Sequence, residues 1–352
     1  MNPAQALTPA QALGAGLAAL LGAPVQGLQR LSGGASQETW AFALATPGGL
    51  QQLILRRAPP GAETRASGNA GLAAEAELSR RAAAAGVPVP RVVAELAPQH
   101  GIGQGFVMQR LHGETLGRRV AAAHRPALAW QCGAALARIH GLVADDLPTL
   151  RRTQPRAEVD HLAAWHAGHG TVRPVFQLAL RWLAQHAPAD VAPRLVHGDF
   201  RNGNLMVDLQ ADGGAVVGAM VSSMPGAPVS PLVGVLDWEL AHLGDPMADL
   251  GWLATHSWRY GQAQRPVGGF GHWAELFGGY RSAGGVVDED RVRWWVVLGS
   301  LRWGVICESM GQAWLSGAEP VMEKAAIGRR ASETEIDLLD QLLPLAEASH
   351  RV

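Results

Sequence analysis

Short apolar runs bounded by glycine and proline occupy the first third of the chain, and their pattern predicts a small sheet. Two strand-like runs flank Gly33 and Gly34, and residues 52–57 read Gln-Leu-Ile-Leu-Arg-Arg. Residues 105–111, Gly-Phe-Val-Met-Gln-Arg-Leu, form the last run of this kind. Short runs that end at turn residues are typical of strands. The first third is therefore expected to contain several strands joined by turns.

Helical periodicity interrupts this pattern twice. Thr8 and Pro9 have the residue types of an N-cap and a first helical residue, so a helix is expected to end near Gly22. A second helix is expected over residues 70–85, where one helical face carries Leu72, Glu75, Leu78 and Ala82. The following Gly-Val-Pro-Val-Pro ends that helix, because the residue before each proline favours an extended backbone.

From Gly113 onward, helical periodicity dominates the chain. We expect helices over residues 117–142, 246–260, 271–283, 289–307, 310–326 and 333–348, and one or two within 160–187. Two short apolar runs interrupt them, at residues 205–207 and 234–236, and these predict strands. The whole pattern indicates an α+β fold with a small strand-rich part and a larger helical part.

Composition narrows the class of protein. A length of 352 residues with 48% hydrophobic residues allows two domains with a sizeable core. The net charge of -1 gives no basic surface for nucleic acid or an anionic membrane, so neither is expected as a partner. Two cysteines, Cys132 and Cys307, predict a reducing compartment and no cysteine metal cluster. The first basic residue is Arg30 and residues 13–25 are too short to span a bilayer, so we expect a cytoplasmic protein.

The candidate catalytic and metal-binding residues lie at the ends of two predicted strands. In His-Gly-Asp-Phe-Arg-Asn-Gly-Asn, Asp199 is followed by Asn204, and Asp237 ends a second apolar strand as Asp-Trp-Glu. Phosphoryl transfer requires a carboxylate that orients and deprotonates a hydroxyl, together with an amide and a second carboxylate that hold Mg²⁺. A helix cap or turn would account for Asp199 alone, but it leaves Asn204 and Asp237 unexplained.

These motifs resemble the aminoglycoside phosphotransferase and choline kinase-like family, from about Leu31 to beyond Leu250. The motifs are H-G-D-x-x-x-x-N, D-W-E and Gly-Asp-Pro-Met-Ala-Asp-Leu at residues 244–250. With Gly-Gly-Ala-Ser and Leu-Ile-Leu-Arg-Arg, the pattern looks closest to bacterial small-molecule phosphotransferases related to the kinase-like domain of some acyl-CoA dehydrogenases. The resemblance implies a two-lobe protein-kinase-like fold. Residues 1–110 would form a small antiparallel-sheet, nucleotide-binding lobe, and residues 111–352 a mainly helical catalytic and substrate-binding lobe.

The resemblance also implies a role for each site residue. Asp199 would be the catalytic base, and Asn204 and Asp237 would bind Mg²⁺. Arg56 stands where the family has a phosphate-binding lysine, and Glu75 would hold it in place. Glu77, on another face of the same helix, is the competing candidate for that partner, and a solvated charge is the plain structural alternative. Arginine keeps the positive charge but replaces a compact ammonium by a planar fork.

The nucleotide site is expected to use mainly backbone groups. Gly33, Gly34 and Ser36 would let backbone N–H groups approach a phosphate closely. Taken alone, a Gly-Gly pair predicts only a hairpin turn. Backbone groups near Gln109 and Leu111 would meet the base of the nucleotide, which leaves ATP and GTP as alternatives.

Other polar residues in and near these motifs have simpler structural interpretations. We expect Asp245 to cap a helix, Asp249 to accept backbone N–H groups of the catalytic loop, and His197 to hold that loop's geometry. His140 is interpreted as a packed or capping histidine. Residues 212–231 exceed the length of a tight hairpin and would either cover the substrate or form a tolerated surface insertion.

The resemblance suggests that the substrate is a small hydroxylated molecule, such as an acyl or CoA-linked metabolite. Two of the seven tryptophans in the expected C-terminal helices should line a ligand pocket, the seven being Trp252, Trp258, Trp273, Trp294, Trp295, Trp303 and Trp314. The acidic residues there are widely spaced, namely Glu275, Asp288, Glu289, Asp290, Glu308 and Glu319. Such spacing argues against a polycationic drug. The alternatives are an antibiotic-modifying phosphotransferase, for an aminoglycoside or macrolide, and a nucleotide-binding pseudokinase or regulatory module.

Overall fold

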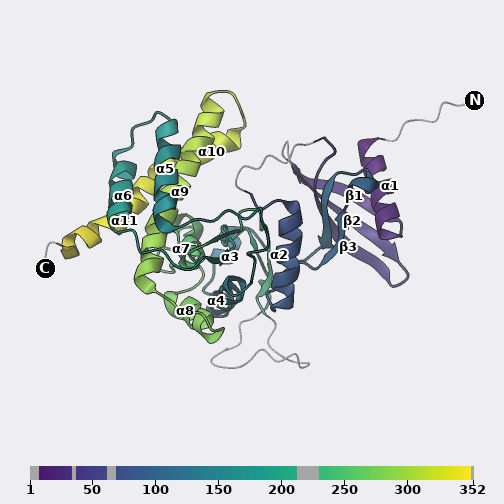
Figure 1. Cartoon of the computed structure of the whole chain (residues 1–352), viewed down its shortest axis with the longest axis horizontal. Helices are drawn as coiled ribbons and strands as arrows, with labels where there is room; N and C mark the ends of the chain where they lie inside the picture. The colour runs from purple at the N-terminus through teal and green to yellow at the C-terminus, as the bar shows by residue number, and fades with distance from the viewer. Residues whose placement is uncertain (1–7, 34–36, 62–68, 212–229, 350–352) are drawn as a thin grey trace, which may run out of the picture.

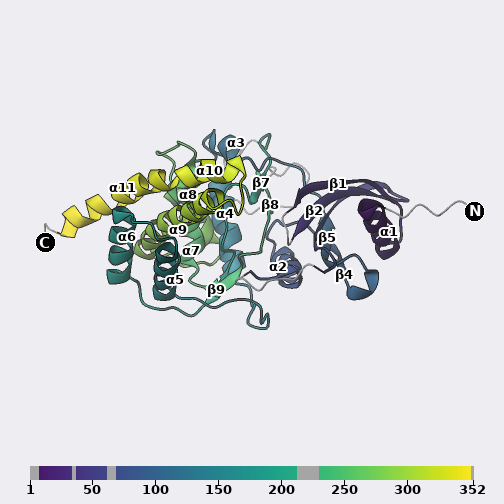
Figure 2. The same cartoon turned by 90° about the horizontal axis from the view of Figure 1, so that it is seen from above.

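A computed structural model describes residues 8–33, 37–61, 69–211 and 230–349. A small antiparallel sheet with two helices forms one end of the molecule, and a larger, mainly helical part forms the rest (Figures 1 and 2). The predicted α+β architecture is confirmed. Among the described residues, no helix combines the length and the apolar character needed to cross a membrane.

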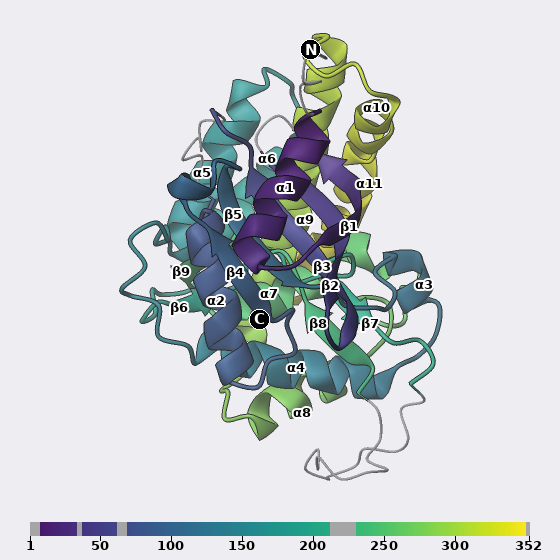
Figure 3. The ribbon, with the colours of Figure 1, turned by 90° about the vertical axis from the view of Figure 1, so that its right-hand side faces the viewer.

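The N-terminal sheet has five strands in the order β1-β2-β3-β5-β4. The strands are β1 (Val25–Gly33), β2 (Glu38–Thr46), β3 (Gly49–Ala58), β4 (Val92–Leu96) and β5 (Gln104–Gln109). Helix α1 (Pro9–Leu21) lies across the outer face of the sheet, and α2 (Leu72–Ala84) packs against β4 and β5 (Figure 3). The predicted first helix is confirmed, with Thr8 as its N-cap and Gly22 in the left-handed conformation at its end.

Strand β3 determines which of two neighbouring arginines faces the larger lobe. Successive strand residues point to opposite faces of a sheet. Leu53 and Leu55 are fully buried in the cluster beneath α1, whereas Ile54 and Arg56 line a cavity on the other face. Arg57 therefore points away from this cavity, and its guanidinium contacts Glu38 and the carbonyl of Ile102.

The larger part consists of helices around two short strand pairs. The helices are α3 (Gly117–Ala121), α4 (Pro126–His140), α5 (Pro155–Gly168), α6 (Pro174–Gln185), α7 (Met247–Leu253), α8 (Trp273–Ser282), α9 (Glu289–Leu315), α10 (Met322–Arg329) and α11 (Ala331–Ser349). Strand β6 (Arg194–Val196) pairs with β9 (His242–Gly244), and β7 (Leu205–Val207) pairs with β8 (Leu232–Val235). Helix α9 lies at the centre and contacts α5, α6, α7, α10 and α11.

Three predicted helix boundaries are wrong. The helix expected over 117–142 is divided into α3 and α4, because Pro126 begins a new helix and holds Arg125 outside helical geometry. The helices expected over 289–307 and 310–326 are wrong at their junction, since α9 runs unbroken to Leu315 and the chain turns at Gly317, whose φ is 75°. The helix expected over 246–260 is α7 followed by a separate 3₁₀ helix, η2 (His256–Arg259).

The packing of α4 against α8 depends on two glycines. A Cβ atom at Gly279 would lie 1.9 Å from the carbonyl oxygen of Trp130, and one at Gly133 would lie 2.0 Å from that of Leu276. Any side chain at either position would push the helices apart. The two cysteines are buried and unpaired with each other, Cys132 in α4 and Cys307 in α9.

Candidate active site

The loop between β6 and β7 carries the His-Gly-Asp motif, and α7 holds it in place. The buried carboxylate of Asp249 accepts the backbone N–H groups of His197 and Gly198 at 2.8 and 2.9 Å. The same carboxylate lies 3.1 Å from Nε2 of His140, whose Nδ1 is 2.8 Å from the hydroxyl of Tyr280. Burial raises the pKa of Asp249, but His140 and His197 hold it below its usual range. The predicted structural roles of Asp249 and His140 are confirmed.

His197 is fully engaged inside the loop. Its Nε2 lies 3.1 Å from the carbonyl oxygen of Leu236, and its Nδ1 accepts the backbone N–H of Asp199 at 3.3 Å. Burial lowers the pKa of His197, so the ring stays neutral. Gly198 has φ of 82°, and a Cβ there would lie 2.3 Å from the carbonyl oxygen of Leu240. His197 thus fixes the shape of the loop, as predicted, and has no ring nitrogen left for the reaction.

Asp199 is held by three side chains. Its Oδ1 accepts the indole N–H of Trp252 at 2.7 Å and Nε of Arg201 at 2.9 Å. Its Oδ2 accepts Nδ2 of Asn204 at 2.7 Å. The side chain is 15% exposed, so it can still meet a ligand. These contacts fix the direction of a carboxylate that retains an unused lone pair on Oδ2.

Asn204 and Asp237 lie at the ends of the paired strands β7 and β8. Because the backbone N–H of Leu236 donates to the carbonyl of Asn204 at 2.8 Å, the two segments run side by side. The amide of Asn204 uses its Nδ2 on Asp199, which leaves its Oδ1 available. Asp237 has φ of 64°, which is uncommon for a residue other than glycine and turns its carboxylate out of the strand. Such residues cluster at ligand sites.

Arg56 joins the two lobes through an ion-pair cluster. Its Nε lies 3.0 Å from Glu75, and its Nη2 lies 2.7 Å from Asp237 and 3.2 Å from Glu239. Nη2 also donates to the side-chain oxygen of Gln37 at 3.2 Å. The predicted pairing of Arg56 with Glu75 is therefore present, and Glu77 instead pairs with Arg81 on the outer face of α2.

The charges in this cluster are unbalanced, with three carboxylates around one guanidinium. Burial lowers the pKa of Arg56, but the carboxylates of Glu75, Asp237 and Glu239 outweigh it and raise that pKa. Burial raises the pKa of Glu75 to about 7, and the neighbouring Asp237 and Glu239 add to this effect while Arg56 opposes it. Burial and Asp237 also raise the pKa of Glu239. An additional cation at Asp237 would relieve this excess of negative charge.

A cavity of about 480 Å³ separates the sheet from the helical part beside this cluster. Asn204 and Asp237 line it from the helical part, and Ile54 and Arg56 line it from β3. Gln109 and Leu111 also line this cavity. Gly33 ends β1, whereas Gly34 and Ser36 lie outside the described residues, as does most of the 212–231 segment.

Two arginines stack on buried tryptophans next to Asp199. The guanidinium of Arg201 lies 4.5 Å from the ring centre of Trp258, and that of Arg302 lies 4.8 Å from the ring centre of Trp252. Trp258 in turn packs on Trp303, with ring centres 4.8 Å apart. The indole N–H groups of Trp258 and Trp303 are buried without a hydrogen-bond partner among the described residues.

Sequence reasoning gave no role at the catalytic loop or the Arg56 cluster to four residues that lie there: Gln37, Arg201, Glu239 and Trp252. Arg201 and Glu239 lie within the two recognised motifs, so their spacing could have suggested them. Trp252 follows Asp249 by three residues, which places it on the same side of α7. Gln37 carries no such signal.

His242, which lies against the catalytic loop, predicts how the stability of the protein depends on pH. His242 in β9 is buried, and its Nδ1 lies 2.9 Å from the carbonyl oxygen of Leu240. Burial and then Arg151 lower its pKa from 6.5 to about 4. At a pH between these two pKa values, His242 carries a proton in the unfolded chain but not in the folded chain. The free energy of unfolding should therefore fall as the pH falls from about 6.5 toward 4. The slope from one such group is at most about 1.4 kcal/mol per pH unit.

Urea unfolding at several pH values between 7.5 and 4.5 measures this slope. His242→Gln should flatten it, because glutamine does not titrate. An identical slope in the parent and the variant would show that another group governs the acid sensitivity.

Comparisons with known proteins agree with this architecture. The sequence model of a protein family described as "Phosphotransferase enzyme family" matches residues 27–219 and 229–286 of this chain. Acyl-CoA dehydrogenase family member 10 of Mus musculus is 28% identical over 255 residues, which cover 69% of this chain and 22% of that protein. The chain thus spans about a quarter of the length of the curated relatives it matches.

Two solved structures share the fold. A protein from Ralstonia eutropha JMP134, assigned to the aminoglycoside phosphotransferases, has a TM-score of 0.66 and 21% identity, covering 94% of this chain and 97% of its own. Spectinomycin phosphotransferase, in complex with ADP and spectinomycin, has a TM-score of 0.59 and 14% identity, covering 97% of this chain and 100% of its own. The fold is therefore the two-lobe kinase-like fold that the motifs implied.

Proposed function

The chain belongs to the phosphotransferase enzyme family, and we propose that it transfers the γ-phosphoryl group of ATP or GTP, with Mg²⁺, to a hydroxyl group of a small molecule. In this proposal residues 1–110 bind the nucleotide, and residues 111–352 supply the catalytic loop and the acceptor site. The convergence of Asp199, Asn204, Asp237 and Arg56 on one inter-lobe cavity is the observation that carries it.

Asp199 is proposed to position the acceptor and to receive its proton. Trp252 and Arg201 occupy Oδ1, and Asn204 occupies one lone pair of Oδ2. The remaining lone pair on Oδ2 is thus the site for the acceptor's O–H. A positioned general base of this kind contributes roughly 10²–10⁴-fold to a rate.

The residues at the strand ends suit Mg²⁺. The carboxylate of Asp237 and Oδ1 of Asn204 are hard oxygen ligands, and the cluster around Arg56 carries excess negative charge. When bound, Mg²⁺ would neutralise charge on the nucleotide phosphates. Arg56, held by Glu75, is proposed to bind the same phosphates through its guanidinium.

The acceptor is proposed to be an anionic, hydroxylated metabolite, such as a hydroxyacyl compound or its CoA-linked form. The guanidinium of Arg201, which stays partly exposed beside Asp199, would favour an anion. The similarity to an acyl-CoA dehydrogenase family member supports an acyl group. The acidic residues that an aminoglycoside would need are engaged elsewhere. Glu275 accepts the backbone N–H of His272, Glu319 pairs with Lys324, and Glu308 is buried.

A screen for nucleotide consumption tests this proposal and its alternatives. Hydroxyacids, their CoA esters, choline-like alcohols, aminoglycosides and macrolides would each be offered with Mg-ATP or Mg-GTP. The Asp199→Asn protein serves as the blank. Acceptor-dependent turnover with a hydroxyacid or its CoA ester is expected. Turnover with a drug alone would support antibiotic modification, and nucleotide binding without any turnover would support a pseudokinase.

The metal assignment gives a second test. Calorimetry should show that Mg²⁺ strengthens nucleotide binding, and that Asp237→Ala abolishes this strengthening because the carboxylate ligand is lost. Asp208→Ala is the matched control, since Asp208 follows β7 and accepts a backbone N–H from Gln210. If the Asp237→Ala protein binds Mg-nucleotide as tightly as the parent, the metal ligand has been misassigned.

A further inference from the structure

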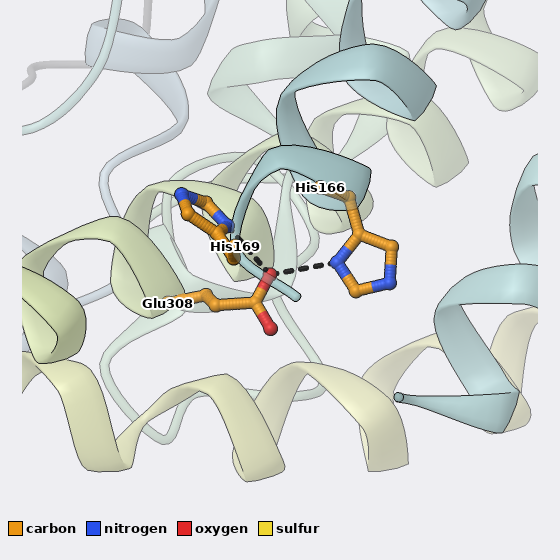
Figure 4. A group of neighbouring side chains, drawn as sticks. All are labelled: His166, His169 and Glu308. Carbon is orange, nitrogen blue, oxygen red and sulfur yellow. Dashed lines mark hydrogen bonds and ion pairs between the residues drawn. The ribbon is translucent and has the colours of Figure 1, made fainter. Parts of the chain in front are cut away.

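Two histidines and a glutamate meet between α5 and α9. His166 lies in α5, His169 immediately follows it, and Glu308 lies in α9. Nδ1 of His166 is 2.7 Å and Nδ1 of His169 is 3.0 Å from Oε2 of Glu308. Figure 4 shows both imidazole rings directed at this one carboxylate oxygen. The three groups offer ligand atoms that all lie within 4.8 Å of one another.

This His-His-Glu cluster is buried and separate from the inter-lobe cavity. The side chains of His166 and Glu308 are 1% and 2% exposed, and that of His169 is 12% exposed. None of the three lines the 480 Å³ cavity beside Arg56. Surface histidines and carboxylates often gather without binding anything, but burial makes the protonation of this cluster matter.

Ser309 holds the ring of His169 from its other side. The hydroxyl of Ser309 donates to the carbonyl of Val305 at 3.1 Å, and its oxygen lies 2.8 Å from Nε2 of His169. When the hydroxyl proton points to Val305, the oxygen of Ser309 accepts Nε2–H, and Nδ1 faces Glu308 with a lone pair. That tautomer is the one that could bind a cation through Nδ1.

The second oxygen of Glu308 has separate partners. Oε1 accepts the hydroxyl of Thr171 and lies 3.4 Å from Nε of Arg173, whose Nη1 pairs with Glu335 at 2.8 Å. Arg173 is thus shared with another carboxylate. Carboxylates that bind a metal through one oxygen commonly have the other held by such outer partners. Histidine ligands commonly donate their second ring N–H, which His169 can do to Ser309, whereas Nε2 of His166 is buried without a partner among the described residues.

We propose that His166, His169 and Glu308 bind a divalent transition-metal ion of the Zn²⁺ class. Two imidazole nitrogens and one carboxylate oxygen suit Zn²⁺, Co²⁺ or Ni²⁺, and they do not suit Mg²⁺, which prefers oxygen ligands. Typical Zn–N and Zn–O distances of about 2.0–2.2 Å place the ligand atoms of a tetrahedral site about 3.3–3.5 Å apart, so the two ring nitrogens would move away from Oε2 by roughly half an ångström. Water would complete the coordination.

Such an ion would join the end of α5 to the central helix. Helix α9 also carries Arg302, which stacks on Trp252 and reaches the carbonyl of Gly198 at 3.4 Å. The proposed ion is therefore structural: it fixes the helix behind the catalytic loop and takes no part in phosphoryl transfer. This separates the inference from the proposed function.

Titration of the chelator-stripped full chain with Zn²⁺ tests the site. Calorimetry should show one ion per chain. A protein of this length should gain about 3–4 °C in Tm when free Zn²⁺ exceeds its Kd 100-fold. Co²⁺ should give visible d–d absorption bands from a low-symmetry site with nitrogen ligands. His169→Gln, at the least buried of the three positions, should remove the Tm gain and the bands while the protein stays folded.

Two matched variants make the result decisive. His161→Gln changes an exposed histidine on α5, the helix that carries His166, and should retain both the Tm gain and the absorption bands. Asp237→Asn should also retain them, which excludes binding at the proposed Mg²⁺ site. The proposal is overturned if the folded parent binds no Zn²⁺, or if His169→Gln binds it as well as His161→Gln does. The cluster would then hold shared protons in place of a metal.

Discussion

The Asp199→Asn protein is expected to fold and to bind nucleotide like the parent, while its turnover falls by a factor of about 10² or more. Asparagine has nearly the same shape, so the contacts from Trp252 and Arg201 to the side-chain oxygen can persist. Its amide nitrogen would replace Oδ2, which carries the lone pair assigned to the acceptor's proton. Initial rates at saturating nucleotide and acceptor, with calorimetry for nucleotide binding, measure the two properties separately.

The matched control is Asp208→Asn, which makes the same chemical change just beyond β7 and outside the cavity. It should retain parental turnover. Full activity in a folded Asp199→Asn protein would remove Asp199 from the role of base. Loss of nucleotide binding together with turnover would instead indicate that the substitution disturbs the loop, because Asn204 would lose a partner on the same carboxylate.

Motifs that are continuous in sequence gave the most accurate expectations. Asp199 and Asn204 share one loop, and Asp249 could be connected to that loop because the Gly-Asp-Pro motif starts a helix. The structure brings these residues together, with Asp249 accepting two backbone N–H groups. Local sequence fixes such geometry because few residues separate the groups that must meet.

Contacts that depend on packing between distant elements could not be predicted in the same way. Trp252 was one of seven candidates for a ligand wall, and its indole N–H to Asp199 depends on how α7 lies against the loop. The junction in α9 was misplaced for a related reason. Apolar periodicity weakens near Glu308 because this side of the helix buries polar groups, and the pattern therefore suggests an end where the helix continues.

The contacts of Arg56 include one that the sequence predicted, with Glu75, and two that it did not. Periodicity placed Glu75 on one face of α2 with apolar residues, and the family resemblance then implied its pairing with Arg56. The simultaneous contacts of Arg56 with Asp237 and Glu239 come from a strand end about 180 residues away. No local pattern encodes them. A metal ion bound at Asp237, as the proposed function requires, would compete with Arg56 for this carboxylate, since both are cations.

Arg56→Ala is expected to lower kcat/KM for nucleotide by about 10- to 100-fold, the equivalent of losing one charge-assisted contact. Arg56→Lys should retain much of the activity, because a cation remains on the same face of β3. Glu75→Gln should reproduce part of the Arg56→Ala defect by releasing the guanidinium. Initial rates across a nucleotide concentration series separate an effect on KM from one on kcat.

Arg57→Ala is the control that the strand geometry provides. Arg57 is the adjacent residue, yet it faces away from the cavity toward Glu38 and Ile102, so its loss should leave nucleotide KM unchanged. If Arg57→Ala raises KM and Arg56→Ala does not, the strand register at the site differs from the one seen here. If neither variant changes kcat/KM, the phosphates are held by other groups. Arg56 would then be a structural counter-ion that links β3, α2 and the Asp-Trp-Glu strand end.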